Sequence, residues 1–366
     1  MIVGDDEKQG WDDNGKAVLR AAGKDTLCVL DISKPEKPQV TATIPLINSV
    51  VGPPTNLAIH PSGEIALVAN SLAPVSEGRG QEMAPDNEAF TIGLKPGPPK
   101  VIGTITVGQQ PSGIAISPNG ELALVANRAD GTISVLSIRG GDVLVVGTVP
   151  VGTAADQVSA VAITPDGRRA LAVKSASDKI ALLSIDGTKV AYDEDGDLPA
   201  GIFPYNIAVT PNGKLALTAD KGAGGGSEGS VGTVSVIELD ANPPRLINRV
   251  TVGDAPEGLA ISPKGNLAIA AELRGSNLSK TSRAHHPAGA VTALKIDGRK
   301  VTNTGSITVG ALPEGVAFSP DGNYLYIGNF SDRDLWVLRV DGSKLTDTSQ
   351  RIRLPGHPAS MRSGPQ

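Results

Sequence analysis

The sequence is poor in several residue types that carry specialised chemistry. A single cysteine, Cys28, leaves no partner for an internal disulfide and excludes a metal site made of several cysteines. Aromatic residues make up only 3% of the 366 residues. No apolar run reaches the length of about 18 residues that a membrane-spanning helix needs. Lysine and arginine form no long basic run and the net charge is −5, so the sequence lacks the basic footprint of a nucleic-acid-binding protein.

Glycine and proline, in contrast, are abundant, with 44 and 28 residues. Both form turns, and the turns of this chain repeat. A six-residue phrase (Ala, an apolar residue, any residue, Pro, any residue, Gly) occurs at 58–63, 115–120, 162–167, 208–213, 260–265 and 317–322. A degenerate seventh copy ends at Gly15. Self-similarity with a period of about 50 residues indicates a repeat architecture, and the apolar fraction of 40% is enough for a buried core.

Each phrase lies between stretches that have the pattern of β-strands. Apolar residues such as 113–116 precede the phrase, small apolar residues such as 122–126 follow it, and a third stretch such as 132–136 alternates strictly. A fourth stretch begins after an Asp-Gly turn, as at Asp297 and Gly298. Four antiparallel strands in each repeat are typical of a propeller blade.

The two ends of the chain complete the ring. Residues 354–361 have the pattern of the start of a blade, and segments 17–21, 26–32 and 40–46 supply the other strands of that blade. A blade built from both termini leaves no open sheet edge. The sequence therefore predicts an all-β, seven-bladed propeller in which residues 1–366 form one domain.

Polar residues gather near one end of the expected axis, the top face, where the first strand of each blade starts and the second strand ends. The Pro-x-Gly turns lie at the opposite end, the turn face. Predicted catalytic residues are Lys174, Asp220 and Glu272 at the ends of second strands, and Glu257, Glu314 and His357 at the starts of first strands. Predicted ligand-binding residues are Asn56, Asn70, Asn127, Gln157, Tyr205, Asn206 and Asn329. The alternative is the ordinary polarity of a solvated ring entrance.

Three long connections between second and third strands are also expected at the top face, at 71–88, 221–232 and 273–289. Long loops on one rim of a repeat scaffold often form a binding wall, although insertions are also tolerated there. The third loop contains His285 and His286, which we add to the predicted ligand-binding residues. Adjacent histidines in a loop are also commonly just solvated.

Carboxylate and amide oxygens that converge on one axis would suit Ca²⁺ or Mg²⁺ better than Zn²⁺. No local ligand spacing demands such an ion, and the charge of Lys174 would oppose it. The sequence therefore predicts no cofactor, with a divalent cation as the alternative.

The second strands carry a family resemblance. Residues 67–70 read Leu-Val-Ala-Asn, and residues 324–329 read Tyr-Leu-Tyr-Ile-Gly-Asn. With the recurrent Val-Gly-x-x-Pro-x-Gly segments at 107–113, 252–258 and 309–315, they resemble the YVTN-repeat family of lactonase-like seven-bladed propellers. The resemblance implies relatives that include sugar-lactone hydrolases, muconate cyclases and binding proteins without known catalysis. Many are exported, which favours a periplasmic or secreted protein, although this chain shows no signal peptide.

Two functional hypotheses follow. The first is a lactonase-like enzyme that acts by acid/base chemistry on a small cyclic ester or carboxylate-bearing substrate in a central pocket at the top face. The second is a non-catalytic periplasmic binding or scaffold protein that uses the top face and its long loops. Both hypotheses predict a small-molecule or other extended ligand. Neither predicts binding to nucleic acid or a membrane span, and we expect a monomer.

Overall fold

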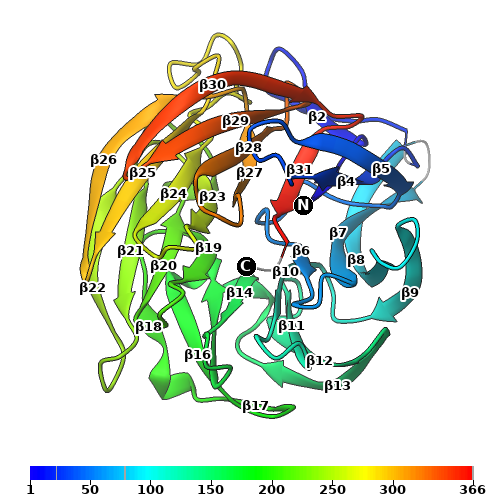
Figure 1. The fold of residues 1–366 in the computed structure, drawn as a ribbon, viewed down its shortest axis with the longest axis vertical. Helices are drawn as coiled ribbons and strands as arrows, with labels where there is room; N and C mark the ends of the chain where they lie inside the picture. The colour runs from blue at the N-terminus through cyan, green and yellow to red at the C-terminus, as the bar shows by residue number, and fades with distance from the viewer. Residues whose placement is uncertain (22, 78–79, 365–366) are drawn as a thin grey trace.

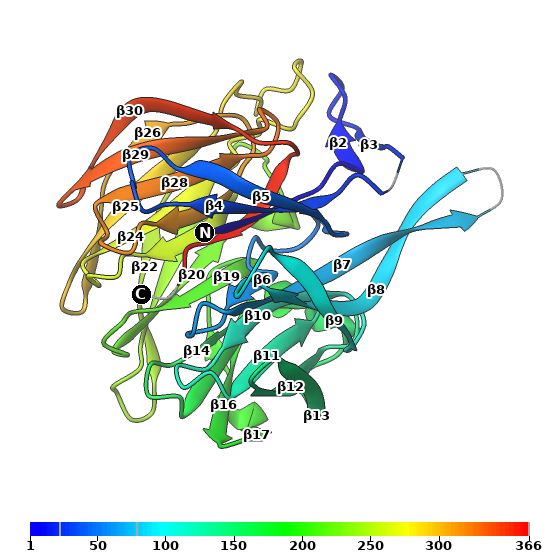
Figure 2. The same cartoon turned by 45° about the vertical axis from the view of Figure 1, so that its right-hand side comes forward.

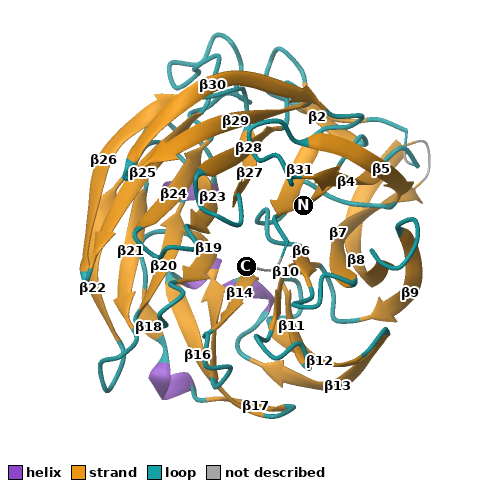
Figure 3. Cartoon of the chain, in the orientation of Figure 1, coloured by secondary structure: helices purple, strands orange, loops and turns teal. Residues whose placement is uncertain are grey.

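The computed structural model describes residues 1–21, 23–77 and 80–364, and these form a ring of seven antiparallel sheets around a central axis (Figure 1). Strands dominate, and the helical segments are short 3-10 turns at Ala154–Asp156, Ser175–Ser177, Glu194–Gly196 and Ala223–Gly225 (Figure 3). The predicted all-β seven-bladed propeller is confirmed. Among the described residues, no helix has the length and apolarity needed to cross a membrane.

We number the blades in chain order and give the strands of each from the axis outward. Blade 1 contains β6 (Leu57–Ile59), β7 (Ile65–Glu77), β8 (Gly80–Gly93) and β9 (Lys100–Thr106). Blade 2 contains β10 (Pro111–Ile116), β11 (Leu122–Asn127), β12 (Thr132–Arg139) and β13 (Asp142–Pro150). Blade 3 contains β14 (Val158–Ile163), β15 (Arg169–Lys174), β16 (Lys179–Asp186) and β17 (Lys189–Tyr192), and β18 (Leu198–Pro199) also pairs with β16.

The remaining blades follow the same plan. Blade 4 contains β19 (Pro204–Val209), β20 (Leu215–Asp220), β21 (Thr233–Glu238) and β22 (Arg245–Thr251). Blade 5 contains β23 (Pro256–Ile261), β24 (Leu267–Glu272), β25 (Ala290–Asp297) and β26 (Lys300–Thr308). Blade 6 contains β27 (Pro313–Phe318), β28 (Tyr324–Asn329), β29 (Asp334–Asp341) and β30 (Lys344–Arg353). Blade 7 contains β31 (Pro358–Arg362), β1 (Ile2–Asp5), β4 (Thr26–Asp31) and β5 (Gln39–Pro45).

The repeated phrase makes the tight turn between the first and second strands of blades 1 to 6. Its closing glycine lies in the left-handed region, for example with φ of 77° at Gly120 and 69° at Gly213. The residue before the proline ties the turn together, since the Ser117 hydroxyl accepts a hydrogen bond from the Leu122 N–H. These local bonds explain why the phrase can recur at each blade independently of the rest of the ring.

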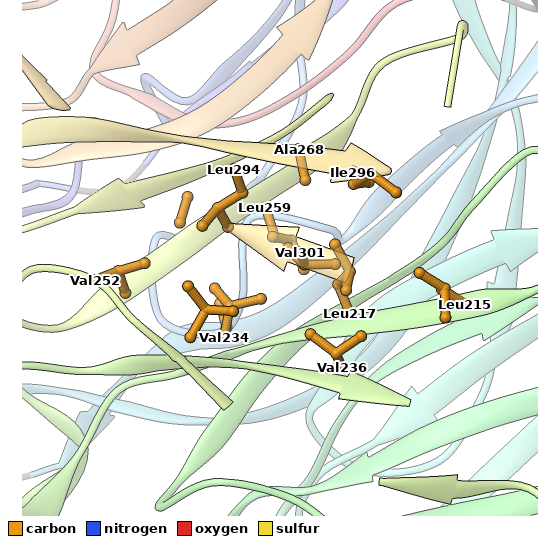
Figure 4. Packing of buried hydrophobic residues seen from close by; sticks show 13 residues of the cluster. Leu215, Leu217, Val234, Val236, Val252, Leu259, Ala268, Leu294, Ile296 and Val301 are labelled. Carbon is orange, nitrogen blue, oxygen red and sulfur yellow. The ribbon is translucent and has the colours of Figure 1, made fainter. Parts of the chain in front are cut away.

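The core lies between blades rather than inside one of them. Leu217 and Val236 of blade 4 belong to the same buried cluster as Leu259, Ala268 and Leu294 of blade 5 (Figure 4). Small residues in the second strands allow neighbouring blades to pack closely, and each buried Leu or Val side chain stabilises the fold by about 1.5–3 kcal/mol.

Blade 7 joins the two ends of the chain, as predicted, but one of its strands differs from the prediction. The second strand is β1, whereas residues 17–21 were expected to form it. Instead β3 (Ala17–Leu19) pairs with β2 (Gln9–Trp11) in a small hairpin outside the blades (Figure 2). Burial explains the difference, because β1 is buried throughout and all three residues of β3 are exposed.

One of the three predicted long loops is likewise different. The segment 71–88 forms most of a two-stranded ribbon, because β7 and β8 continue beyond the blade and project from the ring (Figure 2). Pairs such as Leu72 with Pro85 and Val75 with Glu82 continue the ladder, and a register shift separates it from the part inside the blade. The segments 221–232 and 273–289 do connect second and third strands as loops.

A buried charged cluster fastens the N-terminal part of blade 7. The Lys8 ammonium lies 2.7 Å from an Asp25 carboxylate oxygen and 3.4 Å from one of Asp6, and it donates to the Asn48 carbonyl. Lys8 is only 1% exposed. The cluster therefore joins the segment after β1, the start of β4 and the connection from β5 to blade 1.

Replacing the lysine tests this fastening. Lys8→Met is expected to lower the free energy of unfolding by about 3–5 kcal/mol, because two buried carboxylates lose their cation. Urea unfolding followed by circular dichroism measures the change, with the exposed Lys16→Met as a control of equal charge change. Equal unfolding midpoints for the two variants would show that the cluster does not fasten the blade.

Candidate functional site

The predicted residues at the ends of second strands form hydrogen bonds and ion pairs with other residues of the protein. Asp220 accepts hydrogen bonds from Thr218, Thr233 and Ser235 at 2.6–2.8 Å. Asn127 donates to Thr132 and Ser134, each at 2.9 Å, and these two residues are the counterparts of Thr233 and Ser235 in blade 2. These side chains connect the second strand of a blade to the third.

The other members of this set are similarly engaged. Lys174 pairs with Asp197 at 3.0 Å. Glu272 accepts from the Gly253 N–H at 2.9 Å and from the Thr292 hydroxyl. Asn70 and Asn329 donate to Asp86 and Asp334, at 2.6 and 2.9 Å. The structure thus does not bring Lys174, Asp220 or Glu272 into contact with Glu257, Glu314 or His357.

The residue that follows each second strand lies closer to the first strands. Its backbone N–H donates to the residue just before the first strand, as Lys221 does to the Phe203 carbonyl and Arg128 does to the Gln110 carbonyl. The complete set is Asp6, Arg128, Ser175, Lys221, Leu273 and Phe330. The sequence analysis missed these positions. Strand alternation gives the signal that could have found them, since consecutive side chains point to opposite sides.

Two of these positions, Arg128 and Lys221, join residues at the starts of first strands in one group, which we call the axial cluster: Arg128, Gln157, Tyr205, Lys221, Glu257 and Glu314. Lys221 forms an ion pair with Glu257 and lies 4.2 Å from the centre of the Tyr205 ring. Arg128 donates to Gln157 and lies 5.8 Å from the same ring. The structure thus brings four predicted residues, Gln157, Tyr205, Glu257 and Glu314, together with two unpredicted cations.

The electrostatics of the axial cluster favour a protonated Glu314. Burial, and then the charge of Glu257 beside it, raise the pKa of Glu314 well above its usual range. Burial alone would lower the pKa of Lys221, but the Glu257 carboxylate and Tyr205 raise it. Glu257 and Glu314 are only 5% and 3% exposed, so the arrangement is a desolvated acid–carboxylate–ammonium group.

Local backbone geometry brings Glu257 and Glu314 close together. The pairing of β23 with β24 shifts register between Pro256 and Gly258, which places Glu257 in a β-bulge. A Cβ at Gly258 would collide with the Glu314 carbonyl oxygen, so the glycine permits blades 5 and 6 to approach each other. A bulge commonly re-aims a side chain near a functional site.

The remaining predicted residues lie elsewhere. Asn206 donates to the Glu257 carbonyl at 3.0 Å, and Asn56 donates to Asn48 and to the Ala69 carbonyl. In the third loop, His285 contacts the Gly275 carbonyl at 3.1 Å, while His286 is exposed.

His357 belongs to a separate group under the β2–β3 hairpin. Its Nδ1 lies 2.7 Å from the Phe330 carbonyl oxygen and its Nε2 lies 3.1 Å from the Arg20 guanidinium. The ring stacks on Phe330, and Trp11 of the hairpin packs edge-on against Phe330. Burial lowers the pKa of His357.

The axial cavity lies toward the turn face, whereas the sequence led us to expect a pocket at the top. Its volume is about 410 Å³, and its wall consists of the second halves of the first strands. Near the top end a buried apolar cluster contains Val50, Ala255, Leu273, Leu312, Phe330 and Ala359, with Trp11 packed against it. Leu259 and Val316 of the cavity wall each lie two residues after a glutamate of the axial cluster.

For metals, no group of three His, Cys, Asp or Glu side chains in the described part of the chain is placed to hold an ion. The divalent cation considered from the sequence stays a prediction.

Sequence comparison assigns a family. Residues 12–191 match the model of the family described as "Lactonase, 7-bladed beta-propeller". Over these residues the chain matches a lactonase-family propeller. The resemblance found in the repeat is thereby confirmed. None of the curated proteins matches the chain.

Solved structures show the same fold over nearly the whole chain. A "putative 6-phosphogluconolactonase" from Bacteroides uniformis is 17% identical with a TM-score of 0.72, covering 98% of this chain and 97% of that one. The periplasmic gluconolactonase of Pseudomonas aeruginosa is 18% identical with a TM-score of 0.69, covering 98% of each chain. Hydrazine synthase of Kuenenia stuttgartiensis is 17% identical with a TM-score of 0.64, covering 87% and 92%. Such different names at these identities mean that the likeness shows the fold alone.

The pKa of Asp220 allows a test of whether the carboxyl group at this second-strand end is buried in solution. Burial raises this pKa to about 6, so the folded chain keeps the proton in a range where the unfolded chain loses it. The resulting stabilisation is complete below about pH 4 and is lost as the pH rises through about 6, amounting to roughly 3 kcal/mol. Asp220→Asn, which places there the residue of blades 1, 2 and 6, removes this dependence.

We therefore expect the free energy of unfolding of Asp220→Asn, relative to the unmodified chain, to rise by up to about 3 kcal/mol between pH 4 and 7. Urea titrations at several pH values measure it. The exposed Asp142→Asn is the control and is expected to give a constant difference. A constant difference for Asp220→Asn as well would mean that Asp220 does not titrate in this range.

Proposed function

We propose that the chain is a hydrolase of small cyclic esters, with the Glu257–Glu314 pair of the axial cluster as its proton-transfer group. The observation that carries the proposal is that Glu314 lies buried beside Glu257, which forms an ion pair with the buried ammonium of Lys221, and that this placement raises the pKa of Glu314. Perturbed carboxyl pairs next to a cavity are typical of sites for acid/base catalysis. The match of residues 12–191 to the lactonase family supports the same reaction class.

The chemistry assigns a different role to each group. Glu257, which forms an ion pair with Lys221, accepts a proton from water as the water oxygen attacks the ester carbonyl carbon. The negative charge that develops on the carbonyl oxygen is stabilised by the nearby Lys221 and Arg128 cations. When the ring C–O bond breaks, protonated Glu314 gives its proton to the leaving oxygen, and the product is a hydroxy acid.

The axial cavity is the space that we assign to the substrate. Its walls continue directly from the two strands that carry the glutamates, and a volume of about 410 Å³ suits a small ring. Several wall side chains are apolar, for example Ile163 and Ile207. We thus assign the substrate to a cavity toward the turn face, and the top-face pocket expected from the sequence stays a prediction.

A panel of five- and six-membered lactones, followed by acid release in a pH-stat, tests the activity. Glu257→Gln and Glu314→Gln are each expected to lower kcat/KM by about a hundredfold or more. The activity of the unmodified chain should fall on the alkaline side as Glu314 loses its proton, because its pKa is raised.

Asp220→Asn is the matched control, because it removes a buried carboxylate outside the axial cluster. Full activity of both glutamine variants would overturn the assignment of the pair. No hydrolysis of any lactone by the unmodified chain would overturn the proposed reaction.

The second candidate is a non-catalytic binding or scaffold protein, favoured by the projecting ribbon of β7 and β8 and by the loops 221–232 and 273–289 (Figure 2). Uniform inactivity in the lactone panel would favour it. For either function we propose a periplasmic location, supported by the name of the Pseudomonas aeruginosa protein. Cell fractionation tests the location.

A further inference from the structure

The wall of the axial cavity has one charged exception. At the fifth position of the first strand, blades 2 to 6 have alanine, the first residue of the repeated phrase, and Ala58 is the corresponding residue of the shorter strand in blade 1. Blade 7 has Arg362 there, at the end of β31. The six alanines are Ala58, Ala115, Ala162, Ala208, Ala260 and Ala317, and all of them line the cavity together with Arg362. The longest side chain at this level of the ring is therefore a cation.

Arg362 is half-buried, and many of the side chains that line the cavity with it are apolar. The rest of the wall includes Ile116, Ile163, Ile261 and Phe318. Within residues 1–21, 23–77 and 80–364, no carboxylate forms an ion pair with Arg362. Partial burial lowers the pKa of its guanidinium. A cation in apolar surroundings is costly unless an anion or a hydrogen-bond acceptor accompanies it.

We infer that the axial cavity binds small monocarboxylic acids that have an apolar body, with the carboxylate on Arg362. A guanidinium matches a carboxylate in shape and can hold both oxygens by parallel hydrogen bonds. The Ile, Val, Leu and Phe side chains of the wall would cover the hydrocarbon part of the ligand and strengthen the charge interaction by excluding water. The inference concerns binding alone and does not require that the chain hydrolyse an ester.

Calorimetric titration with benzoate and hexanoate tests the site. Benzyl alcohol and hexanol serve as neutral counterparts, and inorganic phosphate serves as an anion without an apolar body. We expect the two acids to bind at least tenfold more tightly than the alcohols and phosphate, since a hydrogen bond to a charged group contributes about that much. Equal affinity of acids and alcohols would overturn the role of the charge, and tighter binding of phosphate would overturn the apolar class of ligand.

Variants then locate the binding. Arg362→Ala restores the residue of the other six blades, so the fold should survive, and circular dichroism checks this. We expect it to weaken benzoate and hexanoate at least tenfold. Arg168→Ala, an exposed residue next to a turn of the same face, removes an equal charge and should leave the affinities unchanged. Unchanged binding in Arg362→Ala, or equal loss in both variants, would overturn the inference.

A third variant tests the cavity apart from the charge. Ala162→Leu keeps Arg362 but reduces the volume, so it should weaken hexanoate and benzoate without loss of the folded signal. Unchanged binding there would place the acids outside the cavity and overturn the inference. Glu314→Gln, which is expected to stop hydrolysis, should still bind the acids, so failure of the proposed activity and failure of this site give different results.

Discussion

Ring closure is the constraint on which the rest of this structure depends. Seven first strands surround the axis only if β31, near the C-terminus, pairs with β1 at the N-terminus. Blade 7 then has its full four strands, and the inner edge of β1 is paired. The buried Lys8 group holds the N-terminal segments of this blade in place, so a few charged residues support contacts that extend around the whole ring.

The regular scaffold explains why its exceptions attract attention. Small residues and glycines at the first strands allow blades to approach the axis. A large side chain at one of these positions therefore has little space. Glu257 and Glu314 depart from this pattern in neighbouring blades and meet across Gly258. Their proximity, rather than the identity of either residue, creates a carboxyl pair with an unusual affinity for a proton.

Much of this could be predicted from the sequence, and the failures have physical causes. The turn phrase can be recognised in the sequence because its hydrogen bonds are local. Its six copies predict six blades directly. The strand β1 was missed because its short run, Ile-Val-Gly-Asp, carries no turn phrase after it, while Asn14 and Gly15 imitate one. At the axis, Glu257, Glu314, Tyr205 and Gln157 could be found from their positions. Lys221 and Arg128 were missed because the prediction took the last residue of each second strand, whereas the next residue points to the opposite side.

The closing pair of strands also has a consequence for how the protein is made. β1 leaves the ribosome before the strands of blades 1 to 6, and its partner β31 leaves after them, so the inner edge of β1 stays unpaired while six blades assemble. Exposed strand edges can pair with other chains, and contacts between residues distant in sequence form slowly. The order of synthesis therefore makes the last blade the step at which a nascent chain is most exposed to wrong partners, and the axial cavity is complete only after that step.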